Sequence, residues 1–128
     1  MDSNTIPYTQ EGKPRPRVAK RLKWVVLPAR DKDGEDAYPG FEMRMWVNYP
    51  SVLLDEIRSG VQERVRAALL QIVVEHNGWM NEAGEDFPPT TDPSFWDIIP
   101  TELATVMIVL IQKEATTLPN SLLLTKQG

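Results

Sequence analysis

The 128-residue sequence contains no cysteine and only one histidine, His76. Disulfide bridges and cysteine-based zinc sites are therefore excluded, and one histidine cannot form a multi-histidine metal centre. The nucleotide-binding glycine motifs, the nucleophile motif G-x-S-x-G and the zinc motif H-E-x-x-H are also absent. His76 ends a run with helical spacing, so we interpret it as a helix-capping residue. We expect a protein that is not an enzyme and that uses no cofactor or metal.

Long hydrophobic runs are lacking as well. The longest, residues 106–111, is much shorter than the roughly 20 apolar residues that cross a bilayer. Residues 1–4 are polar and do not form the apolar centre of a signal peptide. The sequence thus favours the cytoplasm. Hydrophobic residues make up 41% of the chain and charged residues 25%, which is typical of a globular domain.

Charge is unevenly distributed along the chain. Residues 1–30 carry seven basic and two acidic side chains, a net charge of +5, whereas residues 31–128 carry seven basic and sixteen acidic ones, a net charge of −9. Prolines in residues 1–21 favour extended backbone, so we interpret this segment as a basic arm without its own core. Three roles remain open for the arm: a solvated tail, a contact with the acidic body of a neighbouring copy, or nucleic-acid binding. No aromatic residue lies among its charges to stack on bases, which weakens the third role.

The first half of the chain predicts two strands. Residues 22–27 are rich in β-branched and aromatic side chains, and residues 41–48 begin with alternating apolar and polar positions. The two segments are therefore expected to form a β-hairpin. Trp46 lies on the face of the second strand opposite Met43 and Met45. This placement indicates that both faces of a two-stranded sheet need a cover, one from a helix and the other from another copy of the protein.

Helical spacing follows. The segments that we expect to be helical are residues 51–60, 61–76 and 103–114, with a loop over 79–93 and a short turn over 94–99 that begins at Ser94. Asn77-Gly78 is predicted to cap the second helix, which places Val65, Leu69 and Ile72 in the core. The fold class is α+β and mainly helical, an N-terminal β-hairpin packed on three to four helices. Residues 22–117 form the single globular domain, between the basic arm of residues 1–21 and a C-terminal tail of residues 118–128.

Two acidic segments resemble functional sites only superficially. Residues 31–36 have carboxylates at calcium-loop spacing, but Asp36 stands where such a loop needs glycine, and strands rather than helices flank it. Glu82, Glu85 and Asp86 lie among glycines and prolines, which indicates an exposed loop rather than a buried acid–base pair. We interpret both segments as solvated loops.

Basic, aromatic and leucine side chains are the candidates for contact with a partner. The apolar triplet near the C-terminus must either fold back or bind another surface, and tryptophan is common in interfaces. The predicted partner-binding residues are Lys13, Arg15, Arg17, Lys20, Arg21, Trp46, Trp79, Trp96, Leu122, Leu123 and Leu124.

Two motifs in the second half of the chain carry a family resemblance. Residues 74–88 read as a helix end with a tryptophan, an acidic turn and a proline-containing loop, and residues 96–102 follow the pattern W-x-x-I-P-x-E before the last helix. With the preceding hairpin and helices, residues 39 to about 114 resemble the tail assembly chaperones of siphovirus-type bacteriophages, whose tails are long and flexible.

The resemblance implies a non-enzymatic role. Such chaperones hold the tape-measure protein in the host cytoplasm while tail tube subunits polymerise around it, so both proteins are expected partners, with self-association as a further option and no membrane partner. An alternative is a structural virion component, of capsid or tail, whose basic arm contacts subunits or nucleic acid. A small nucleic-acid-associated protein is a third interpretation.

We predict that residues 1–21 and 118–128 become ordered only against a partner. Neither segment can bury enough apolar surface alone to offset about 1–2 kcal/mol of backbone entropy per ordered residue. Hydrogen exchange on dilute, monomeric protein should therefore show weak protection in both segments. Strong protection of both segments would show that they belong to the folded body.

Overall fold

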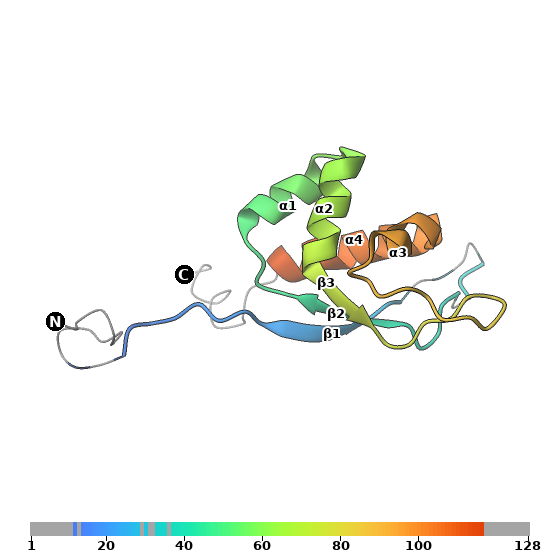
Figure 1. Cartoon of the computed structure of the whole chain (residues 1–128), viewed down its shortest axis with the longest axis horizontal. Coiled ribbons are helices and arrows are strands. Elements are labelled where there is room, and N and C mark those ends of the chain that lie inside the picture. The colour runs from blue at the N-terminus through green and yellow to red at the C-terminus, as the bar shows by residue number, and fades with distance from the viewer. Residues whose placement is uncertain (1–11, 13, 29, 31–32, 36, 117–128) are drawn as a thin grey trace.

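The computed structural model describes residues 12, 14–28, 30, 33–35 and 37–116 (Figure 1). Within this part of the chain, strands and helices follow the order β1–β2–α1–α2–β3–α3–α4. Their bounds are Leu22–Val26 for β1, Glu42–Trp46 for β2, Ser51–Arg58 for α1, Gln62–Ile72 for α2, Val73–His76 for β3, Pro93–Ile98 for α3 and Thr101–Thr116 for α4. The protein is therefore α+β, as the sequence predicts.

The three strands form one antiparallel sheet in the order β1–β2–β3. Arg44 at the middle of β2 faces Trp24 of β1 and Glu75 of β3, and the register with β3 shifts between Arg44 and Met45. Because side chains alternate between faces, Met43 and Met45 point to one face, where both are fully buried. The described helices all lie on that face of the sheet (Figure 1).

The third strand corrects the prediction of a helix over residues 61–76 and of a two-stranded sheet. α2 ends at Ile72, and the chain continues directly as β3. Ile72, Val73 and Val74 are consecutive β-branched residues, which favour extended backbone. Pairing with β2 also satisfies backbone groups that a longer helix would leave unpaired at a buried sheet edge. Asn77-Gly78 consequently follows a strand and does not cap a helix.

The core lies between the sheet and the helices. Leu69 and Ile72 of α2 are buried as predicted, whereas Val65 is half-buried against the core. α4 contributes one buried side chain per turn, namely Leu103, Met107 and Ile111. Tyr49 links the layers, because its hydroxyl donates to the carbonyl oxygen of Ile111 at 3.0 Å. Burial raises the pKa of Tyr49 to about 12.

The segment before α3 is anchored in the core rather than fully solvated. Thr90 is completely buried, and its hydroxyl donates to the carbonyl oxygen of Val73 at 3.1 Å. Its own carbonyl accepts a hydrogen bond from Nε1 of Trp96 at 3.0 Å. The N-cap of α3 is Asp92 and not Ser94 as predicted: the backbone N–H and the hydroxyl of Ser94 donate to the Asp92 carboxylate and lower its pKa.

We predict that Leu69→Ala lowers the free energy of unfolding by about 2–5 kcal/mol, because it leaves a cavity in the core. Val52→Ala is the matched control in α1, since Val52 is 60% exposed, and it should change that energy by less than about 0.5 kcal/mol. Urea unfolding measures both values. Equal effects of the two substitutions would contradict the orientation of α2.

Candidate functional site

The face of the sheet that the helices leave open is the first candidate site. We define the outer sheet face by the side chains that the strand register places opposite the core: Leu22, Trp24 and Val26 of β1, Glu42, Arg44 and Trp46 of β2, and Glu75 of β3. The β1 residues form an apolar row, in which Leu22 is 39%, Trp24 42% and Val26 62% exposed. On the neighbouring strands, Arg44 donates to Glu75 at 3.0 Å.

The outer edge of β1 also presents backbone N–H and C=O groups that no described strand pairs. Val47 N–H donates to the carbonyl of Arg21, and Leu27 N–H donates to the carbonyl of Phe41, both at 2.9 Å. In an antiparallel pair the residues that bond to the neighbouring strand alternate. The residues between these two, Lys23 and Val25, therefore direct their backbone groups to β2. Those of Leu22, Trp24 and Val26 point to the outer edge of β1, where no described strand pairs with them.

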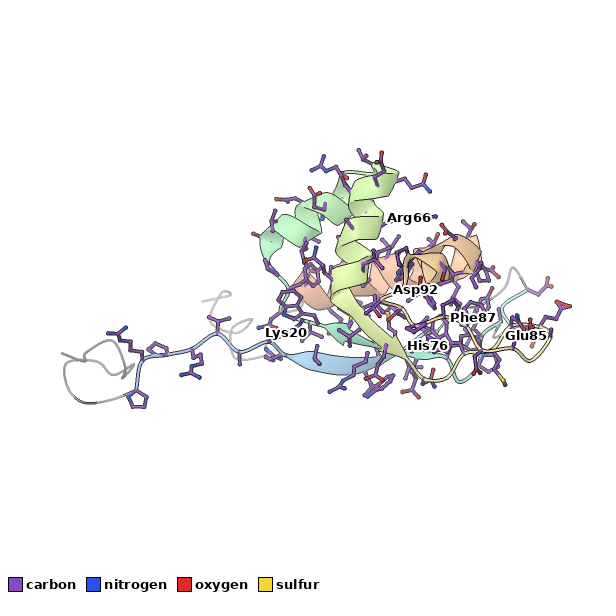
Figure 2. All side chains as sticks on the ribbon, viewed as in Figure 1. Lys20, Arg66, His76, Glu85, Phe87 and Asp92 are labelled. Carbon is purple, nitrogen blue, oxygen red and sulfur yellow. The ribbon has the colours of Figure 1, made fainter. Side chains whose placement is uncertain are left out.

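The described part of the basic arm leads directly into this edge. The Asn48 side chain holds it, because Oδ1 accepts from Arg21 N–H and Nδ2 donates to the Ala19 carbonyl, both at 2.8 Å. Nζ of Lys20, a residue labelled in Figure 2, lies 4.4 Å from the ring centroid of Trp46, which is a cation–π contact. Nε1 of Trp46 is buried and has no hydrogen-bond acceptor within the described residues. The described arm residues before Lys20, residues 12 and 14–19, are exposed.

Two of the three tryptophans predicted to bind a partner are buried. Trp79 and Trp96 are only 3% and 6% exposed, and their rings belong to the core. Trp46 lies on the outer sheet face as predicted and is half-buried under Lys20. Sequence reasoning missed Trp24, the most exposed tryptophan, although its alternation with Val25 carries the signal. Lys13 and Leu122–Leu124 lie outside the described residues, whereas Arg15 and Arg17 are exposed on the arm.

His76 is the centre of the second candidate site and corrects the prediction of a helix cap. Its Nδ1 accepts hydrogen bonds from the backbone N–H groups of Gly78 and Trp79, both at 3.0 Å, and its Nε2 lies 3.1 Å from the carbonyl oxygen of Pro88. Because two donors point at Nδ1, the proton is on Nε2, which donates to Pro88. The ring packs against those of Trp79 and Phe95, with centroid distances of 5.4 and 5.8 Å, and these two rings also contact each other at 5.5 Å. His76 therefore has a structural role.

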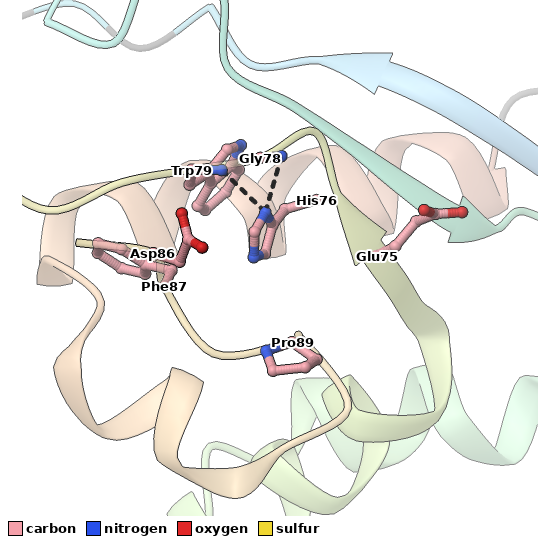
Figure 3. A pocket seen from close by; sticks show the side chains of 7 residues that line it. All are labelled: Glu75, His76, Gly78, Trp79, Asp86, Phe87 and Pro89. Atoms are coloured by element: carbon pink, nitrogen blue, oxygen red, sulfur yellow. Dashed lines mark hydrogen bonds between the residues drawn. The ribbon is translucent and has the colours of Figure 1, made fainter. Parts of the chain in front are cut away.

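A cavity of about 320 Å³ lies beside this histidine. We call it the aromatic pocket, and it is lined by Glu75, His76, Gly78, Trp79, Asp86, Phe87 and Pro89. Figure 3 shows the Asp86 carboxylate directed toward the middle of the pocket, whereas that of Glu75 points away from it. The lining thus combines aromatic surface with one inward carboxylate.

A second cavity, of about 380 Å³, contains Tyr38, Phe41, Met80 and Ile98 in its lining. The Tyr38 hydroxyl donates to the Glu102 carboxylate at 2.6 Å. Burial and this bond to a negative group raise the pKa of Tyr38 to about 12. The tyrosine is therefore a hydrogen-bond donor at neutral pH and not a base.

The described residues contain no group of three or more His, Asp or Glu side chains placed to hold a metal ion. No helix in the same part of the chain has the length and apolar character needed to cross a membrane. Comparison with protein-family models, curated proteins and solved structures finds no match to this chain. The outer sheet face with its open edge and the aromatic pocket are therefore the features from which function must be inferred.

We predict that His76→Phe lowers the free energy of unfolding by about 1–3 kcal/mol, because phenylalanine keeps the ring packing but leaves the two N–H donors without their acceptor. Glu75→Gln, an exposed change at the neighbouring residue, should cost less than about 1 kcal/mol. Urea unfolding compares the two variants. In the wild type, nitrogen NMR should find the His76 proton on Nε2, and a proton on Nδ1 alone would contradict the assignment.

Proposed function

We propose that this protein is a non-enzymatic bacteriophage tail assembly chaperone, which holds the tape-measure protein in the host cytoplasm while tail tube subunits polymerise around it. The observation that carries the proposal is the open edge of β1, where Leu22, Trp24 and Val26 present both backbone hydrogen-bonding groups and apolar side chains. The resemblance of residues 39 to about 114 to this family supports the choice of partner.

An open strand edge binds an extended segment of another protein by adding a strand to the sheet. The main-chain groups of Trp24 and its neighbours would supply hydrogen bonds, and the apolar row would receive alternate side chains of the segment. Five residues of strand make a small contact. Such a contact dissociates readily, which suits a protein that must release its partner as the tail tube grows.

Charge beside the edge indicates the character of the bound segment. Lys20 and Arg21 precede β1, whereas the charge of Lys23 within it is paired with Glu114 of α4 at 3.3 Å. Lys20 and Arg21 favour a partner segment with acidic residues next to its apolar ones, and the attraction should weaken as salt is added. Residues 118–128, with Leu122–Leu124, are proposed as a second contact, separate from the domain of residues 22–117.

A structural virion component is the alternative proposal. The exposed residues of the arm, including Arg15 and Arg17, support it because an extended basic segment suits contact with a neighbouring subunit or with nucleic acid. Mass spectrometry of purified particles separates the two proposals. A chaperone is absent from the finished particle, whereas a structural component is present in a fixed ratio to the tube or capsid subunits.

We predict that Trp24→Lys lowers co-purification with the co-expressed tape-measure protein by roughly tenfold, because it places a charge in the apolar row. Leu22→Pro tests the edge itself: proline is tolerated at the first residue of a strand, and it removes an N–H that points outward. Val109→Lys on α4 is the matched control, since Val109 is 56% exposed and lies outside the site. If Trp24→Lys and Leu22→Pro bind the tape-measure protein as well as the control Val109→Lys does, the β1 edge is excluded as the site.

A further inference from the structure

The aromatic pocket has the chemistry of a site for a positively charged side chain. Its walls include the rings of His76, Trp79 and Phe87, and its inward carboxylate belongs to Asp86 (Figure 3). Aromatic faces attract cations, and a guanidinium both stacks on a ring and pairs with a carboxylate. Asp86 has no salt-bridge partner within the described residues. Its charge is therefore available to a ligand.

The basic arm supplies such side chains, but at the opposite end of the molecule. Lys20, where the arm joins the body, and Phe87 and Glu85, beside the pocket, are well separated along the longest axis (Figure 2). The described arm residues before Lys20 run away from the body (Figure 1). An arm with this course cannot reach the pocket of its own molecule. It is well placed to reach the pocket of another.

We propose that the aromatic pocket binds an arginine side chain from the basic arm of a second copy of this chain, so that copies associate head to tail. The arm, residues 1–21, carries five basic and two acidic side chains, a net charge of +3. Residues 22–128 carry nine basic and sixteen acidic ones, a net charge of −7, so arm and body are complementary between copies. Arg15 and Arg17 flank Pro16, which keeps this part of the arm extended and lowers the entropy lost on docking.

Each copy has one arm and one pocket, so the interface is heterologous. A dimer formed in this way still has a free arm and a free pocket, which allows further copies to add. The association should weaken steeply with salt, because it depends on a charge pair near the surface. It does not use the β1 edge, and it is therefore independent of the proposed chaperone function.

Mixing two complementary variants of the purified full chain tests the proposal. Arg15→Glu with Arg17→Glu disables the arm and keeps the pocket, whereas Asp86→Lys disables the pocket and keeps the arm. Sedimentation velocity at low salt should show wild-type protein whose mass rises with concentration. Each variant alone should associate at least roughly tenfold more weakly, and their mixture should form a one-to-one dimer that does not grow further.

Two controls make the test specific. Glu82→Lys changes the same charge in the same loop but outside the pocket lining, and it should associate within about threefold of the wild type. Trp24→Lys should associate as the wild type does, which separates this result from a failure of the proposed function. Asp86→Asn keeps the shape of the side chain and removes its charge, so it should also weaken association. It replaces Asp86→Lys in the test if circular dichroism shows that Asp86→Lys is unfolded.

Three results would overturn the proposal. The first is a wild-type protein that stays monomeric at the highest concentration it tolerates at low salt. The second is an equal loss of association in Asp86→Lys and Glu82→Lys, which would assign the docking to the general acidity of the loop. The third is a mixture of the folded arm and pocket variants that forms no dimer, because the arm and the pocket would then not be each other's partners.

Discussion

Most of this structure depends on one requirement: the side of β2 that faces away from β1 needs hydrogen-bonding partners. β2 carries Met43 and Met45 into the core, so its backbone is enclosed and needs partners on both sides. β1 supplies one side through the hairpin. The other side is paired only because the chain leaves α2 at Ile72 and turns at once into β3. This abrupt change from helix to strand makes β3 one edge of the sheet and leaves β1 as the other.

The same pairing builds the aromatic pocket. Asn77 follows β3 and connects the turn after it to the start of β2. Its Oδ1 accepts from Glu42 N–H at 2.9 Å and from Trp79 Nε1 at 2.8 Å, while its Nδ2 donates to the Gly40 carbonyl at 2.8 Å. His76 then holds the turn at Gly78 and Trp79 through Nδ1. A polar pair at the end of a strand thus positions the aromatic rings, and the loop that returns past them supplies Asp86.

The sequence predicted the features that follow from the local spacing of apolar side chains. The alternation of residues 41–48 and the helical face of Leu69 and Ile72 follow directly from side-chain spacing, and both are confirmed. The end of α2 was not predictable in this way, because Val73 fits a helical face as well as a strand, and the need of β2 for a partner is a property of the tertiary fold. The burial of Trp96 likewise depends on Thr90, whose anchoring role has no signal in the sequence.

A sheet covered on one face has an open edge, and an open edge invites unselective pairing. This strand has only five residues, and the basic side chains of Lys20 and Arg21 lie next to it, which limits that risk. Charge near the edge repels other copies that present the same edge, since two such strands would bring like charges together. A segment with acidic residues meets no such barrier. In the proposed function, the charges that oppose pairing of β1 with a second β1 would therefore also favour an acidic partner segment.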